Sequence, residues 1–171
     1  MKQTMQYLTS KKSVEHYTPK LYIDLAKEVM GSIDLDPASN ELAQRTVQAA
    51  SYYTSNGLEQ PWYGNVWLNP PYNGHAKHWT KKIVASYQNN EISQGIVLCF
   101  AKLGYNWFRD LIKVYPTCLF YDRIHFINEQ TMLPAKSKAP HGSAFVYLGD
   151  NTEKFKGTLR AYGSIVEDML I

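Results

Sequence analysis

Apolar residues recur along the chain in two alternating patterns: long segments with helical spacing, and short continuous runs. Helical spacing predicts helices over 18–30, 40–50, 75–89, 107–114 and 155–162. Short apolar runs predict strands over 33–36, 65–68, 95–100, 117–121, 143–148 and 164–166. The run 95–100 (GIVLCF) is apolar throughout, as expected of a strand buried on both faces. Strands that alternate with helices predict an α/β domain with a mostly parallel sheet.

Local signals suggest where several of these elements begin and end. Thr18 suits the N-cap of the first helix, with Pro19 as its first helical residue, and Gly31 suits its end. Residues 51–61, which contain an Asn-Gly pair, and residues 128–141, which contain two prolines, are expected to be loops. Residues 123–126 either extend the preceding strand or begin a partner for it.

Length, composition and charge favour a single cytoplasmic domain. The chain has 171 residues, and we predict a flexible segment over 1–13 and one domain over 14–171. The net charge of +3 permits nucleic acid as a partner without requiring it. Cys99 and Cys118 lie in apolar runs without a CxxC motif, which indicates neither a zinc site nor a disulfide. Residues 1–13 lack the apolar centre of a signal peptide, and no apolar run approaches the roughly 20 residues of a membrane span.

Two turns follow predicted strands at positions where α/β proteins bind ligands. Asp36-Pro37-Ala38-Ser39 follows the strand 33–36, and Asn69-Pro70-Pro71-Tyr72 follows the strand 65–68. Ligands of parallel sheets bind beyond the carboxyl ends of the strands. Both turns are therefore expected to face one crevice.

The second turn has the chemistry of a receptor for a planar amine. Each proline fixes its own φ and keeps the residue before it out of the helical conformation, so the turn is stiff. The Asn69 side-chain oxygen and the Pro70 carbonyl can then accept hydrogen bonds from one amino group, and Tyr72 offers a face for a planar ring. The alternative is a purely structural turn, because Asn-Pro and Pro-Pro are common turn signals.

Three motifs, which follow one another along the chain, together resemble the motifs of a known family. Asn69-Pro70-Pro71-Tyr72 after a strand resembles the catalytic motif of amino-group methyltransferases that use S-adenosylmethionine. Asp36-Pro37-Ala38-Ser39 resembles their acidic cofactor turn, and Tyr17-Thr18-Pro19 resembles the element that closes over the methionine part of the cofactor. Together with the late RIHFIN and HGSAFVYLG segments, these motifs resemble the phage-type DNA N6-adenine methyltransferases (phage Dam) over roughly residues 14–166.

The resemblance implies a fold, a reaction and a role for each motif. It implies a Rossmann-like methyltransferase fold: a mostly parallel twisted sheet with helices on both faces and a final antiparallel hairpin strand. It implies methyl transfer from S-adenosylmethionine, without a metal, to N6 of an adenine flipped out of double-stranded DNA. Asn69 and Pro70 match the positions that accept hydrogen bonds from the amine, Pro71 the position that stiffens the turn, and Tyr72 the position that stacks on the base. Tyr17, Thr18, Pro19 and residues 36–39 match the cofactor site.

The candidate nucleic-acid contacts are basic residues in two segments. These basic residues could contact phosphates, and it is equally plausible that they are ordinary solvated surface residues. The residues are Lys77, Lys81, Lys82, Arg123, Lys136 and Lys138. The glycines that often follow the acidic turn are absent. Either Asn40 or Glu41 is therefore the candidate residue for binding the ribose of the cofactor. Asp34 either lies near the crevice or is a solvated strand position.

Several alternatives stay open. The turn also suits methyl transfer to cytosine N4, to guanine N2 in RNA or to a protein glutamine, and a non-catalytic nucleic-acid-binding module on the same fold is a further reading. Without a separate recognition domain, we expect a short or loose recognition sequence, read from residues 73–82 and 124–142. The oligomeric state is not indicated, and protection from host restriction rests on the resemblance alone.

Overall fold

The structure is a computed structural model that describes residues 16–72 and 74–167, so the segment expected to be flexible, 1–13, lies outside it. The helices in the described part are α1 (Lys20–Met30), α2 (Glu41–Val47), α3 (Ala76–Gln88), α4 (Asn106–Ile112) and α5 (Thr152–Leu159). The strands are β1 (Leu35–Asp36), β2 (Ser51–Tyr52), β3 (Gly64–Leu68), β4 (Ile92–Phe100), β5 (Thr117–Phe120), β6 (Ser143–Leu148) and β7 (Gly163–Val166). Strands and helices alternate as the sequence predicts, except that β2 is followed directly by β3 and β5 directly by β6.

The strands form one sheet in the order β2-β1-β3-β4-β6-β5-β7. The four strands β2, β1, β3 and β4 pair in parallel, whereas β6 is antiparallel to both β4 and β5, and β7 is antiparallel to β5. The prediction of a mostly parallel sheet with one final antiparallel strand is therefore wrong for the second half of the sheet. The reason is that β6 enters between β4 and β5, so antiparallel pairing begins before the last strand.

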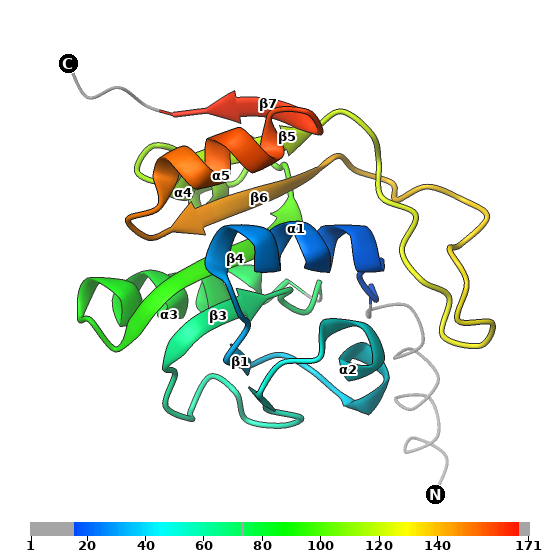
Figure 1. Cartoon of the computed structure of the whole chain (residues 1–171), viewed down its shortest axis with the longest axis horizontal. Helices are drawn as coiled ribbons and strands as arrows, with labels where there is room; N and C mark the ends of the chain where they lie inside the picture. Colours follow the sequence, from blue (N-terminus) through cyan, green and yellow to red (C-terminus); the bar gives the residue numbers. More distant parts are fainter. Residues whose placement is uncertain (1–15, 73, 168–171) are drawn as a thin grey trace, which may run out of the picture.

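Helices cover both faces of this sheet (Figure 1). Residues of α1, α2 and α5 pack with Trp67, Ile96 and Leu98 on one face. Residues of α3 and α4 pack with Val66, Leu68, Val97 and Cys99 on the other. Alternate residues of β3 and β4 thus enter opposite cores, which explains why β4 is apolar on both sides.

Both cysteines are free and buried, and burial raises the pKa of each thiol to about 12. A thiol with so high a pKa is a weak nucleophile at neutral pH. Cys99 and Cys118 therefore serve the packing of the core.

The ends of α1 and α2 differ from the sequence prediction in informative ways. Gly31 ends α1 as expected, at φ 86° with its N–H on the Lys27 carbonyl. The prediction that Thr18 caps α1 is wrong: Pro19 is the N-cap, and the Thr18 hydroxyl accepts a hydrogen bond from the Asn69 side chain instead. The helix predicted over 40–50 ends at Val47.

The segment that follows α2 contains a strand where the sequence predicts only a loop. Gln48 adopts the left-handed conformation at φ 50°, and the next residues hydrogen-bond to the chain around β1. Residues 51–52 thereby become β2. This short strand is set by main-chain contacts rather than by its own side chains.

Residues 121–142 form a long connection between β5 and β6. Residues 123–126 do not extend β5; instead, the carbonyls of Ile124 and Phe126 accept hydrogen bonds from Ala139 and Ala135 within the connection. Its Ile127 N–H donates to the Tyr17 carbonyl at 2.8 Å. The connection therefore lies against the segment that precedes α1.

Candidate active site

The strand order places the two predicted turns side by side. The chain moves from β1 outward to β2 and then returns to the other side of β1 as β3, so the direction of strand addition reverses between β1 and β3. Leu35 pairs with Val66 in parallel register, so both strands end at the same edge of the sheet. Crevices at such a reversal are the usual ligand sites of open α/β sheets.

The Asn69 side chain is held so that its oxygen is left free. Its Nδ2 donates to the His16 carbonyl at 2.7 Å and to the Thr18 Oγ1 at 3.3 Å. Its Oδ1 is buried and has no hydrogen-bond partner in the described part of the chain. A buried acceptor without a partner is costly, and a ligand that donates a hydrogen bond would remove that cost. Asn69 can therefore receive an amino group.

Aromatic contacts fix the ring of Tyr72, which belongs to the same turn as Asn69. It lies against Phe100 with centroids 4.3 Å apart and against the edge of His16 at 5.1 Å. Its hydroxyl donates to the Leu98 carbonyl at 3.2 Å, and burial raises the pKa of Tyr72 well above its usual value. Tyr72 remains partly exposed, so its uncharged ring can offer a surface for stacking.

A cavity of about 490 Å³ opens over Tyr72. Its walls come from four distant segments of the chain, and they include residues that the sequence analysis did not assign to a site: His16, Phe100, Lys102, Tyr105 and Trp107. One signal could have found Phe100 and Lys102, because they lie at the carboxyl end of β4, next to β3. Aromatic walls with basic groups at the rim suit a planar, anionic ligand such as a nucleotide.

Asp36, at the end of β1, is an acid buried in an environment that disfavours its charged form. The side chain is buried, its Oδ2 accepts from the Gln44 Nε2 at 2.9 Å, and its Oδ1 has no partner in the described chain. Burial raises the pKa of Asp36 to about 7, and polar groups of Ser39, Ala38 and Gln44 oppose that rise. A ligand that donates to Oδ1 would stabilise the ionised form.

A second cavity, of about 320 Å³, lies between the two turns. Its lining includes Pro37, Ala38 and Ser39 of the first turn, Pro71 of the second, and residues 53–59. The backbone of Gly57 approaches the Pro37 carbonyl so closely that a Cβ there would lie 2.0 Å from its oxygen. The free Asp36 oxygen and this cavity fit a ligand that bridges the two turns, as S-adenosylmethionine would have to do.

Of the predicted cofactor residues, Thr18 contacts the second turn and Tyr17 contacts Asn40, the residue that follows the first turn. Thr18 is buried and contacts Asn69 as described above. The Tyr17 hydroxyl accepts from the Asn40 Nδ2 at 3.2 Å, and the Asn40 Oδ1 caps α2 by accepting from Ala43 N–H at 2.9 Å. Asn40 is thus engaged in capping, whereas Glu41 is exposed at the start of α2.

Asp34 lies away from the crevice. Its Oδ2 accepts from the Asn65 N–H at 2.8 Å at the start of β3, and its Oδ1 accepts from Ser32 at 3.1 Å. A side chain on Gly64, at φ 64°, would collide with this carboxylate. Asp34 therefore has a structural role at the opposite edge of the sheet.

The candidate nucleic-acid residues divide into engaged and exposed groups. Lys82 donates to the Leu58 and Gln60 carbonyls at 2.6 and 2.7 Å and lies over the Trp62 ring, so it fastens the 53–61 loop to α3. Burial lowers the pKa of Lys82. The exposed members of the set are Lys77, Lys81, Arg123, Lys136 and Lys138. Of these, Lys77 lines the cavity over Tyr72.

Among residues 16–72 and 74–167, no group of three or more His, Cys, Asp or Glu side chains is placed to hold a metal ion. No helix in the part of the chain that the structure describes is long and apolar enough to cross a membrane.

Comparison with known proteins identifies the family. No curated protein compared with the chain matches it significantly. The model of the family described as DNA N-6-adenine-methyltransferase (Dam) matches residues 8–166, which include both turns and all seven strands. The chain therefore belongs to the DNA N-6-adenine-methyltransferase (Dam) family.

Proposed function

We propose that this protein transfers a methyl group from S-adenosylmethionine to N6 of an adenine that is flipped out of double-stranded DNA into the cavity over Tyr72. Family membership supports adenine in DNA as the acceptor. The observation that carries the proposal for the site is the buried Oδ1 of Asn69, which has no hydrogen-bond partner in the described part of the chain, in the same turn as Tyr72, which lines the aromatic cavity.

Asn69 and Tyr72 act on the target base in this proposal. The Asn69 Oδ1 and the Pro70 carbonyl accept hydrogen bonds from N6, which holds the amine in one orientation and raises electron density on its nitrogen. Tyr72 stacks on the base, which offsets the cost of removing it from the duplex. Since both Nδ2 hydrogens of Asn69 are committed to His16 and Thr18, the amide cannot turn and present a donor to the amine.

The first turn and the segment 17–19 hold the cofactor. Asp36 offers its free oxygen to a donor of the cofactor, residues 37–39 line the cavity that receives it, and Tyr17, Thr18 and Pro19 close it from the side of α1. S-adenosylmethionine would supply an electrophilic methyl group: the N6 lone pair forms the new C–N bond as the S–CH3 bond breaks, the neutral thioether is the leaving group, and N6 loses a proton to water. The protein contributes orientation and exclusion of water rather than a basic residue.

Exposed lysines and arginine hold the DNA backbone. Lys77 lies at the rim of the cavity, and Arg123, Lys136 and Lys138 lie on the 121–142 connection. Cations at these positions can pair with phosphates on either side of the flipped nucleotide. Lys82 is left out of this set because its ammonium is bound to main-chain carbonyls.

The test is methyl transfer from labelled S-adenosylmethionine to unmethylated duplex DNA, followed by mass spectrometry of the nucleosides. RNA and a protein mixture are assayed in parallel. We expect 6-methyladenine in DNA, and sequencing of the modified sites gives the recognition sequence. Label in RNA or protein alone would contradict the proposal, as would 4-methylcytosine in place of 6-methyladenine.

A further inference from the structure

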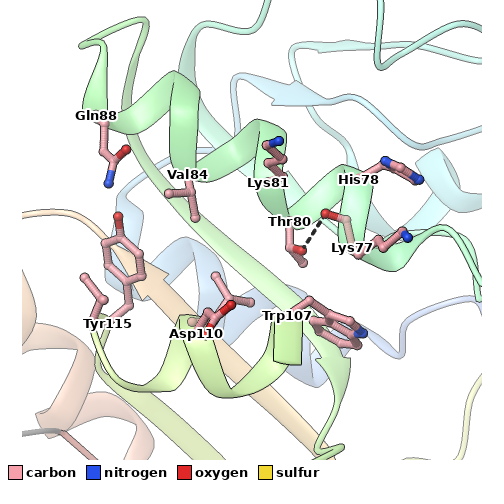
Figure 2. Close-up of a pocket in the computed structure, with 11 residues that line it drawn as sticks. Lys77, His78, Thr80, Lys81, Val84, Gln88, Trp107, Asp110 and Tyr115 are labelled. Carbon is pink, nitrogen blue, oxygen red and sulfur yellow. Dashed lines mark hydrogen bonds between the residues drawn. The ribbon is translucent and has the colours of Figure 1, made fainter. Parts of the chain in front are cut away.

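A groove of about 590 Å³ lies between α3 and α4, outside the site described above (Figure 2). Its α3 side carries Lys77, His78, Thr80, Lys81, Val84 and Gln88, and its α4 side carries Trp107, Asp110, Leu111, Val114 and Tyr115. Figure 2 shows Lys77 and Trp107 at one end and Gln88 and Tyr115 at the other. The groove therefore has a distinct end at the starts of both helices.

This end of the groove adjoins the cavity over Tyr72. Lys77 and Trp107 line both hollows. Each is the second residue of its helix, and both helices start near the carboxyl edge of the sheet, where β3 and β4 end. A chain molecule bound over Tyr72 can thus continue into the groove without leaving the protein surface.

The chemistry of this end suits a nucleotide. Trp107 is half-buried, so its indole is held by the fold yet keeps exposed surface for a second ring. Lys77 and Lys81 are exposed on the facing helix. In the lining of the groove, two lysines and a histidine stand against one aspartate, which favours an anionic occupant over another protein surface of mixed charge.

We propose that the Lys77–Trp107 end of the groove binds the nucleotide next to the target adenine, with its base on Trp107 and its phosphate between Lys77 and Lys81. The inference rests on the proposed function, because it takes the cavity over Tyr72 as the place of the target base. Adjacent nucleotides are covalently linked, so a strand with its target base over Tyr72 places a neighbour at the mouth that the two hollows share. Trp107 is then the residue on which the flanking base stacks.

DNA affinity measured by fluorescence anisotropy tests the proposal without requiring activity. Because base–aromatic stacking contributes to affinity, Trp107→Ala should weaken duplex binding about tenfold, whereas Trp107→Phe should retain most of it. Lys81→Glu should weaken binding and lower the slope of log affinity against log salt by about one. Calorimetric affinity for S-adenosylmethionine should stay at the parent value in all three variants.

Two control variants make similar changes at exposed positions outside the groove. Lys113→Glu makes the same charge change just after α4, outside the groove, and Tyr63→Ala removes an exposed aromatic ring before β3. Both should bind DNA as the parent does. The other three tryptophans, 62, 67 and 79, are buried, so DNA should quench a tryptophan signal that is lost in Trp107→Phe.

The outcomes separate this inference from the proposed function. Parent affinity and undiminished quenching in the Trp107 variants would overturn the subsite even if adenine methylation is observed. DNA binding that depends on Trp107 without methyl transfer would support the subsite and contradict the proposed function. A parent dimer that Trp107→Ala dissociates, with unchanged DNA affinity, would assign the groove to a second copy and overturn the inference.

Discussion

The two turns at the carboxyl edge of the sheet each bury one side-chain oxygen that has no hydrogen-bond partner among residues 16–72 and 74–167, but they do so in different ways. Asn69 is neutral, and its donors fix its orientation, so its oxygen is available at any pH. Asp36 is ionisable, and burial raises its pKa to about 7. The comparison indicates that hydrogen bonds orient the proposed acceptor for the target amine, whereas the proposed cofactor side carries an acid whose charge depends on pH and ligand.

The largest effect is expected at Asn69. Asn69→Ala removes the acceptor and should lower the methyl-transfer rate by about a hundredfold or more. The reason is that the lost hydrogen bond stabilises the charge that develops on the amine nitrogen in the transition state. Affinity for S-adenosylmethionine, measured by calorimetry, should change little. Asn89→Ala, which truncates an exposed carboxamide after α3, is the control. Transfer by Asn69→Ala at the parent rate would refute the role of the turn.

Asp36→Asn sharpens the comparison through pH. The folded-state pKa of about 7 lies above 3.8, so the folded state retains a proton that the unfolded state releases, and Asp36 makes the parent less stable as pH rises from about 4 to 7. Asp36→Asn removes this penalty and should raise the free energy of unfolding at pH 8 by at most about 4 kcal/mol, and by less at pH 5. Urea denaturation at both values measures the difference.

The same variant should bind S-adenosylmethionine more weakly, because the amide does not replace an ionised acceptor. A variant that is stabilised equally at pH 5 and pH 8 would show that Asp36 is not the titrating group. Unchanged cofactor affinity would remove Asp36 from the proposed cofactor site.

Substitutions at Tyr72 separate the ring from its hydroxyl. Tyr72→Ala removes the stacking surface and should weaken productive binding of the target base by about tenfold, as seen in KM for DNA. Tyr72→Phe loses only the hydrogen bond to the Leu98 carbonyl, about 1 kcal/mol of stability, and should keep activity within a few-fold. Equal losses in both variants would argue for a role of the hydroxyl in the reaction.

The smallest effect is expected at Thr18, which holds Asn69 across 3.3 Å. Thr18→Val keeps the shape but removes the acceptor, so kcat should fall a few-fold with little change in the KM for DNA. Thr18→Ser retains the hydroxyl and should restore kcat. A loss in Thr18→Ser as large as in Thr18→Val would indicate that packing, not the hydrogen bond, positions Asn69.

The apolar runs and the turn residues sufficed to predict most helices, the core strands and the edge at which the two turns meet. What could not be predicted depends on contacts between distant segments. The strand β2 exists because main-chain groups near β1 pair with it, and the Thr18 hydroxyl serves Asn69 rather than α1. Lys82 has the same sequence signal as Lys81, yet only Lys82 reaches the carbonyls of the 53–61 loop.

Residues 16–18 contact three parts of the proposed machinery at once: the second turn, the start of α2 and the 121–142 connection. They hold Asn69 through the His16 carbonyl and the Thr18 hydroxyl, meet the cap of α2 through Tyr17, and pair with Ile127 of the basic 121–142 connection. A ligand that favours one position of this segment therefore changes the free energy of binding on its other sides. Thermodynamic reciprocity then requires that the factor by which S-adenosylmethionine strengthens DNA binding equals the factor by which DNA strengthens S-adenosylmethionine binding.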